Sequence, residues 1–246
     1  MTQTVGFIGS GMIGGSLARL AVAAGLNVVM SNSRGPETLA ELITELGEHA
    51  RAATPQEATK AGDVVVATVP LGVYRKLPAD ALAGKIVIDT MNYYPQRDGR
   101  IAELDSGEIT SSELLQRHLA NSRVVKALHN LDWIRLYSRA RPADAPDRSA
   151  LPVAGDNPAA KAEIIRLMDV LGYDGVDIGT LADSWRCEPR TPVYVQPYQG
   201  PSPAQMGEPE WQRWFREAPG EPVSADRVKE LVDQAVRGGP VGGHFG

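Results

Sequence analysis

The sequence predicts an α/β fold, a Rossmann-type, doubly wound and mostly parallel sheet with a small C-terminal lobe. Two observations support this prediction: a glycine-rich turn joins the first expected strand to the first expected helix, and apolar strand-like runs then alternate with helical patterns. From Glu188 onward, prolines interrupt most periodic stretches. We therefore expect residues 1–188 to form the main domain and residues 189–246 a proline- and glycine-rich tail that packs on it or on a partner subunit.

Composition and charge narrow the class of protein. The chain has 246 residues, 43% of them hydrophobic, which is enough to bury a sizeable core. Its formal net charge of −5 gives no electrostatic reason to expect a nucleic acid or a membrane as partner. Cys187 is the single cysteine, which fits a reducing compartment, and Arg19 and Asn27 interrupt the most apolar stretch. We therefore expect a cytoplasmic protein without a signal peptide or a membrane span.

The glycine-rich turn has the pattern of a dinucleotide-binding loop. An apolar strand from Thr4 to Ile8 runs into Gly9-x-Gly11-x-x-Gly14, and a helical period begins at once. The first glycine permits a tight turn, the second lets the backbone approach a pyrophosphate, and the third lets the helix pack on the strand. The residues expected to contact the dinucleotide here are Gly9, Ser10, Gly11, Met12, Ile13 and Gly14.

The segment after the second expected strand predicts which dinucleotide binds. NAD-binding versions of the fold carry an Asp or Glu here that bonds the ribose 2′-hydroxyl. This chain has Ser31-Asn32-Ser33-Arg34 instead. A guanidinium and hydroxyl donors suit a 2′-phosphate, so we expect NADP(H), bound by Asn32, Ser33 and Arg34. The alternative is that Asn32 and Ser33 only cap the next helix and that Arg34 is a solvated surface charge.

The third apolar run places further candidates beside the dinucleotide. Asp63–Val69 is largely β-branched, typical of a strand buried on both faces, and Pro70 ends it. Ligands of open α/β sheets lie outside the carboxyl ends of the strands. We therefore expect Thr68, Val69 and Pro70 near the nicotinamide ribose or the pyrophosphate, with simple strand termination as the alternative.

Two more strand ends predict the substrate side of the cleft. Lys85–Asp89 leads into a polar, aromatic-rich loop, so Asn92 and Tyr93 should border the substrate. Arg123–Leu128 ends at His129, where a histidine is either a ligand or proton donor or a structural hydrogen-bonding residue. We take His129 as the candidate catalytic residue.

The remaining chain predicts several local features. Ser111 or Ser112 is expected to cap a helix through Leu119, and the proline-containing segment from Arg139 to Arg148 is expected to be a mobile loop or a lid. Asn157 should start an amphipathic helix that Gly172 ends. Further expected elements are a last strand at Tyr173–Ile178 and helical stretches at Trp211–Glu217 and Asp226–Val236.

The chemistry is expected to come from the cofactor. The chain has no Cys/His cluster with metal-ligand spacing and no G-x-S-x-G motif, so we expect neither a metal site nor a serine nucleophile. Reduction of a carbonyl or imine would need a general acid, for which His129, Tyr93, Tyr94 and Lys126 are candidates. Hydride transfer to another redox ring would need none.

Several motifs, in this order, resemble the NADPH:F420 oxidoreductase family, also called F420-dependent NADP reductases. The resemblance covers about residues 4–190 and rests on the glycine-rich turn, Ser31–Arg34, Val65–Pro70, Val124–His129 and Asp177–Leu181. It implies a chain that is nearly all Rossmann domain and moves hydride directly between NADPH and the deazaflavin coenzyme F420.

The resemblance also implies roles for individual residues. Ser33 and Arg34 would bind the 2′-phosphate, the turn after His129 would line the cofactor ring, and Gly179 and Leu181 would close the deazaflavin side. Thr180 replaces a proline of the family pattern, and Trp185 and the long tail then follow. Trp185 is therefore a further candidate for the acceptor pocket, and another small-molecule redox acceptor stays open.

Two alternative functions stay open. One is an NADPH-dependent reductase of a small carbonyl or imine, but such enzymes carry a long helical domain for which the proline-rich tail leaves no room. The other is a non-catalytic NADP-binding sensor. We also expect a homodimer, because the tail has no core of its own in which to bury Trp211, Trp214 and Phe215.

Overall fold

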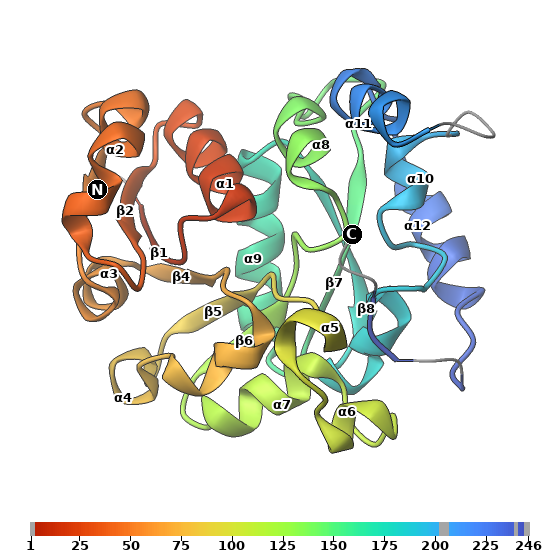
Figure 1. Ribbon diagram of the computed structural model, residues 1–246, viewed down its shortest axis with the longest axis horizontal. Coiled ribbons are helices and arrows are strands. Elements are labelled where there is room, and N and C mark those ends of the chain that lie inside the picture. The colour runs from red at the N-terminus through yellow and green to blue at the C-terminus, as the bar shows by residue number, and fades with distance from the viewer. Residues whose placement is uncertain (1–2, 202–206, 239–240, 244–246) are drawn as a thin grey trace.

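The computed structural model describes residues 3–201, 207–238 and 241–243. Within them, eight strands form one sheet in the order β3-β2-β1-β4-β5-β6-β7-β8 (Figure 1). The strands are β1 (Thr4–Ile8), β2 (Asn27–Ser31), β3 (Ala50–Ala52), β4 (Val64–Ala67), β5 (Ile86–Asp89), β6 (Arg123–Lys126), β7 (Ala150–Gly155) and β8 (Asp174–Gly179). β1 to β6 are parallel, and β7 runs antiparallel to β6 and parallel to β8. The predicted fold class is confirmed.

The strand order creates a crevice where the chain changes direction along the sheet. From β1 the chain moves outward to β2 and β3, then returns to β4 on the other side of β1. The connections that leave the carboxyl ends of β1 and β4 therefore diverge, and ligands of doubly wound sheets bind at this point.

Helices cover the sheet between and after the strands. The α-helices are α1 (Met12–Ala23), α2 (Ala40–Leu46), α3 (Pro55–Ala61), α4 (Ala79–Leu82), α5 (Pro95–Asp98), α6 (Ala102–Asp105), α7 (Ser111–His118), α8 (Trp133–Ser138), α9 (Pro158–Val170), α10 (Gln196–Gln199), α11 (Glu208–Glu217) and α12 (Ala225–Asp233). The 3-10 helices are η1 (Pro36–Leu39), η2 (Leu71–Lys76) and η3 (Leu181–Cys187). In the described part of the chain, no helix has both the length and the apolar character needed to cross a bilayer.

Two large apolar clusters hold the layers together. One contains Leu17 of α1, Ile164 of α9 and Val228 of α12, and the other contains Leu115 of α7 and Leu181 of η3. Because the strands are parallel and buried on both faces, each face needs its own cover. The result is a sheet between two helical layers.

The residues after Glu188 are partly built into this core. Figure 1 shows α12 at the end of the sheet far from β3, where it contacts β7 and β8. The amide of Ala150 in β7 donates to Val223 O (2.7 Å), and the Tyr198 hydroxyl donates to Ala150 O (3.0 Å). In contrast, α11 has no buried residue and lies beside α8, with Trp211 stacked on Phe215. Both helices were predicted from the sequence.

Some local features differ from the prediction. The cap of α7 is Thr110, whose side chain accepts from Glu113 N, so the assignment to Ser111 or Ser112 is wrong. The Thr-x-x-Glu pattern is a capping box that starts one residue earlier. Asn157 caps α9 as expected, and its side chain accepts from Ala160 N (2.9 Å). β3 was not predicted.

The segment from Arg139 to Arg148 is anchored rather than free, which contradicts the expected lid. The buried Arg148 guanidinium pairs with Asp169 (2.7 Å) and Asp174 (2.8 Å). Arg139 is also buried and lies 3.4 Å from the Asp147 carboxylate. Arg141 also pairs with Asp147 (3.0 Å), so three arginines anchor this loop, which the proline pattern did not indicate.

Candidate functional site

The glycine-rich turn lies where β1, β2 and β4 meet. Gly9 has φ +116°, and its amide donates to Ser31 O (3.0 Å). A Cβ at Gly9 would collide with the Thr68 carbonyl oxygen after β4, and one at Gly14 would lie 2.5 Å from Gly9 O. These two glycines are therefore required by the contact between strand and helix.

Gly11 differs from its neighbours because the space around it is open. Apart from its chain neighbours and the backbone of its own helix, no atom of the described residues lies within 4 Å of where its Cβ would be. Gly11 is the N-cap of α1, no side chain caps this helix, and no acidic residue lies in its first turn. The free backbone N–H groups and the positive end of the helix dipole therefore point into an open space that suits a pyrophosphate. A Cβ at Gly11 would occupy part of this space. The residues present fit a dinucleotide.

Asn32 shapes the loop predicted to select the 2′-phosphate. Its Oδ1 accepts from the amides of Arg34 (2.9 Å) and Gly35 (3.0 Å), and its Nδ2 lies 3.4 Å from Ser10 Oγ. This Asx turn connects the loop to the glycine-rich turn and leaves Ser33 and Arg34 exposed. The Arg34 guanidinium forms no ion pair with any residue that the structure describes.

One carboxylate near this loop was not considered in the sequence analysis. Glu37, in the first turn of η1, folds back against Gly35, where it would meet a Cβ on that glycine. Its charge lies near the expected 2′-phosphate site and opposes the effect of Arg34.

Thr68, Val69 and Pro70 continue the crevice beyond β4. The Thr68 amide donates to Ile8 O (2.9 Å), and its methyl group lies under Gly14. Val69 is half-buried and Pro70 is exposed at the start of η2. The structure thus brings these residues next to the glycine-rich turn, as expected.

A buried polar network lies at the ends of β5 and β6. Lys126 is fully buried, and its Nζ donates to Asp89 Oδ2 (3.4 Å), Ser111 Oγ (3.4 Å) and Met91 O. Ser112 Oγ donates to the same Asp89 oxygen at 2.7 Å. The network fixes the loop that begins at Met91, because both the Lys126 ammonium and the Asp89 carboxylate hold this residue.

Glu188 extends this network toward the tail. Its Oε1 accepts from the amide and the hydroxyl of Ser111, at 2.8 and 2.7 Å. A carboxylate from the end of η3 therefore meets the N-terminus of α7, where negative charge is favourable. Of this network, only Lys126 was predicted as a candidate for the chemistry, whereas Ser111 and Ser112 were expected only as helix caps.

Three side chains next to the network share an unusual feature. Asn92 Nδ2 donates to His129 O (3.1 Å), Asn130 Nδ2 donates to Cys187 O (3.1 Å), and His129 Nε2 lies 3.0 Å from the same carbonyl. A carbonyl oxygen can only accept, so each of these side chains directs its donor nitrogen at the carbonyl. The other polar atom of each side chain is an acceptor and is directed elsewhere. Asn92 Oδ1, His129 Nδ1 and Asn130 Oδ1 are buried and have no partner in the described part of the chain. We call these three residues the acceptor cluster.

The charge state of His129 follows from the same surroundings. Burial, with the positive charge of Lys126 as a second cause, holds the pKa of the imidazole well below its usual range. The ring is therefore neutral at neutral pH, with its proton on Nε2, facing Cys187 O. In this state His129 has no proton to give from Nδ1.

Backbone strain is concentrated beside the acceptor cluster. Leu128 has φ +58° immediately before His129, and Val195 has φ +55°. The Val195 amide donates to Asn130 O at 2.8 Å. A positive φ is a true outlier for a β-branched residue, and such strain collects at ligand sites.

Tyr93 and Tyr94 do not present free hydroxyls to this cluster. Tyr93 is buried, and its hydroxyl donates to Asp105 Oδ1 (2.9 Å) and accepts from Ile101 N (2.9 Å). The Tyr94 hydroxyl bonds the Tyr194 hydroxyl. Because its hydroxyl is held by Asp105 and Ile101, Tyr93 serves as a packing residue of the loop that carries Asn92.

The three remaining candidates form none of the hydrogen bonds of the acceptor cluster in the described structure. Gly179 O accepts from Lys161 Nζ (2.9 Å), and Leu181 is a core residue whose carbonyl accepts from Thr110 Oγ1 (2.9 Å). Trp185 is half-buried and lines a separate cavity. A role for Gly179 and Leu181 beside an acceptor ring stays a prediction.

Comparison with known proteins agrees with this geometry. Residues 4–93 match the family described as NADP oxidoreductase, coenzyme F420-dependent. This segment is thus similar to that family. The match covers the glycine-rich turn, the Ser31–Arg34 loop and the strand end at Thr68–Pro70. The match agrees with the expected NADP-binding domain of an oxidoreductase.

Solved structures and a curated relative extend the likeness. The fold is similar to SMa0349, a hypothetical protein from Sinorhizobium meliloti, at 28% identity and a TM-score of 0.70, covering 80% of this chain and 94% of that one. A candidate F420-dependent NADP reductase from Arthrobacter sp. fb24 shares the fold at 23% identity and a TM-score of 0.64, covering 75% and 87% of the two chains.

The curated relative matches a shorter segment. The protein YjhV of Escherichia coli (strain K12) is 43% identical over 53 residues, which cover 22% of this chain and 39% of YjhV. The match thus spans well under half of that relative.

Proposed function

We propose that the protein transfers hydride between NADP(H) and a second redox ring, and that this ring is the deazaflavin of coenzyme F420. Two kinds of evidence support the proposal. The matched family is described as F420-dependent. The site itself offers no free general acid, and this second observation carries the argument.

Each candidate acid has its protons engaged. Lys126 directs its ammonium at Asp89, Met91 and Ser111, and the neutral His129 faces Cys187 O with its N–H. The Tyr93 hydroxyl donates to Asp105, and the Tyr94 hydroxyl bonds the Tyr194 hydroxyl. Reduction of a neutral carbonyl needs a proton at the oxygen, whereas hydride exchange between two ring systems needs only alignment and exclusion of water.

The chain's own residues would then act by binding and positioning. NADPH, when bound, supplies the hydride. The N-terminus of α1 would hold the pyrophosphate at Gly11, and Arg34 would neutralise the 2′-phosphate. Thr68 and the buried Lys126–Asp89 pair fix the strand ends that border the crevice. Because Lys126 and Asp89 are fully buried, they keep this floor rigid and dry.

A second candidate is reduction of an iminium, which the acceptor cluster favours over a carbonyl. An iminium is already protonated and needs no acid, and its N–H would donate to an unpartnered acceptor such as Asn92 Oδ1 or Asn130 Oδ1. A carbonyl oxygen would face these acceptors with lone pairs, which is repulsive.

The deciding experiment is anaerobic mixing of the protein with NADPH and oxidised F420, followed by the loss of the visible F420 absorbance. We expect turnover with F420, slower turnover with NADH, and none with a simple ketone. Turnover of a cyclic iminium but not F420 would select the second candidate. Tight NADPH binding without turnover of either acceptor would contradict both and leave the sensor function.

A further inference from the structure

Hydrogen bonds between the ends of β4, β5 and β6 place the acceptor cluster beside the dinucleotide crevice. The Thr90 amide and the Thr90 hydroxyl both donate to Ala67 O, at 3.2 and 3.1 Å, and Thr68 of the crevice follows Ala67 directly. Asn92 comes two residues after Thr90, and its Nδ2 donates to His129 O beyond β6. A dinucleotide that extends across the crevice from the glycine-rich turn would therefore bring its nicotinamide end to this cluster.

The cluster presents buried hydrogen-bond acceptors without a donor. His129 and Asn130 have only 2% and 0% of their surface exposed, and Asn92 is half-buried. Asn92 Oδ1, His129 Nδ1 and Asn130 Oδ1 have no partner among the described residues. Because an unpaired buried acceptor is costly, three of them in linked side chains indicate a donor that comes from outside the chain.

The backbone holds these acceptors in one orientation. The donor nitrogen of Asn92 is engaged by His129 O, and those of His129 and Asn130 by Cys187 O. A flip of either amide would bring its oxygen against a carbonyl oxygen, which is repulsive. Leu128, with φ +58°, sets the backbone directly before His129. The acceptors are therefore already oriented before a ligand arrives, which lowers the entropy cost of binding.

The surroundings indicate which kind of donor fits. The charge of Lys126 contributes to the lowered pKa of His129, so a second positive charge at this place is unfavourable and a neutral donor is preferred. A water molecule that donated to two of the acceptors would turn its lone pairs toward the third. The nitrogen of a primary carboxamide carries two protons and accepts no hydrogen bond, so it suits a site made of acceptors.

We propose that the acceptor cluster binds the amide NH₂ group of the nicotinamide carboxamide of NADP(H) and thereby positions the ring. The inference rests on the proposed function, but it concerns how the dinucleotide is held rather than which molecule exchanges hydride with it. By holding the amide, the cluster prevents the ring from turning about its bond to the ribose, so that one face meets the second reactant. The same acceptors are then not available to the N–H of an iminium.

Two analogues of NADP⁺ separate the amide nitrogen from the rest of the ring. The 3-acetylpyridine analogue carries a methyl group in place of the NH₂ group, whereas the thionicotinamide analogue keeps the NH₂ group and carries sulfur in place of the oxygen. Calorimetric titration gives the Kd of each without any turnover. We expect the acetylpyridine analogue to bind about tenfold more weakly than NADP⁺, and the thionicotinamide analogue to bind within about twofold of it.

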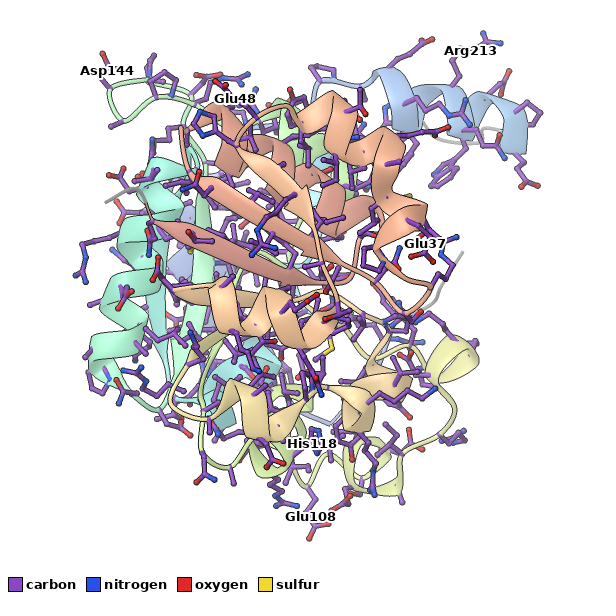
Figure 2. All side chains as sticks on the ribbon, turned by 90° about the vertical axis from the view of Figure 1, so that its left-hand side faces the viewer. Glu37, Glu48, Glu108, His118, Asp144 and Arg213 are labelled. Carbon is purple, nitrogen blue, oxygen red and sulfur yellow. The ribbon has the colours of Figure 1, made fainter. Side chains whose placement is uncertain are left out.

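The variant Asn92→Ala tests whether the cluster causes this difference. The ratio of the Kd of the acetylpyridine analogue to that of NADP⁺ should fall from about ten to about two. A purely structural role of Asn92 would weaken both dinucleotides equally and leave the ratio unchanged. Two controls, Asn121→Ala at an exposed asparagine before β6 and Arg213→Ala on the outer surface of α11 (Figure 2), should keep the wild-type ratio. Thermal unfolding confirms that each variant is folded.

The other outcomes overturn the proposal. Equal Kd values of the wild-type protein for NADP⁺ and the acetylpyridine analogue would do so without any variant. A wild-type ratio that persists in Asn92→Ala would place the amide elsewhere, and a loss of affinity for F420 alone would assign the cluster to the second reactant. The proposed function fails separately: discrimination between the analogues without reduction of F420 would refute hydride transfer to F420 and leave the carboxamide assignment in place.

Discussion

The dinucleotide end and the acceptor end of the site lie along the same edge of the sheet but differ in construction. The dinucleotide end consists mainly of backbone, shaped by Gly9, Gly11 and Gly14 within six consecutive residues. The acceptor end consists of side chains from β5, β6, α7 and η3, such as Lys126 and Glu188. A backbone site needs few residues and places them close in sequence, whereas a side-chain network joins distant segments and depends on burial.

The largest effect should come from breaking the acceptor end at its centre. Lys126→Met would leave the Asp89 carboxylate buried without its cation, so we expect a loss of about 3 to 5 kcal/mol in the free energy of unfolding. Urea unfolding of the variant and of the wild type measures this difference in the free energy of unfolding. The control Lys229→Met removes an exposed ammonium and should cost at most about 0.5 kcal/mol. Equal effects for the two would mean that the buried network does not stabilise the fold.

At the dinucleotide end, two substitutions of the same size should have opposite signatures. Gly9→Ala places a methyl group against the Thr68 carbonyl at φ +116°, so it should destabilise the protein by about 3 kcal/mol. Gly11→Ala adds the same methyl in open space and should leave stability within about 0.5 kcal/mol while weakening NADPH binding. Thermal unfolding and calorimetric titration separate the two. Equal NADPH affinity for Gly11→Ala and wild type would argue against a pyrophosphate at this turn.

A smaller effect is expected at the loop that selects the dinucleotide. Arg34→Ala should raise the KM for NADPH by about tenfold and leave that for NADH nearly unchanged, because only NADPH carries the 2′-phosphate. Glu37→Gln should act in the opposite direction, by about twofold, because it removes an exposed charge that solvent already screens. Arg213→Ala serves as the matched control. Equal losses for both cofactors would refute the 2′-phosphate role of Arg34.

The smallest effect concerns the acceptor cluster and its dependence on pH. The folded pKa of His129 lies below its unfolded value, so the unfolded chain binds more protons between the two. The free energy of unfolding is therefore highest above about pH 6.5. It decreases as the pH falls below this value, by up to about 1.4 kcal/mol per pH unit. His129→Gln keeps a donor for Cys187 O and should flatten this slope. An unchanged slope between pH 6.5 and 5.5 would show that His129 is not the group that titrates.

The same contrast explains which parts of the fold and of the site could be predicted from the sequence. The three glycines and the Ser31–Arg34 segment identified the dinucleotide end because each acts within a few residues of its neighbours. β3 was missed because Ala50–Ala52 is too short for an alternating pattern to appear, although it pairs with β2 at the sheet edge.

The acceptor end could be predicted only in part. His129 and Asn92 were chosen as strand-end residues, but their tautomer and amide orientation depend on carbonyls contributed by Cys187 and by His129 itself. No local spacing connects residue 111 to residue 188.

The docking of α12 also has a consequence for synthesis on the ribosome. Val228, Leu231 and Val232 belong to the same apolar cluster as Val5 and Phe7, so the first strand and the last described helix complete one core. Folding that depends on such distant contacts is slow, and a nascent chain must emerge to about residue 232 before α12 can pack on β7 and β8. Until then the part of the core that Val228, Leu231 and Val232 complete stays open.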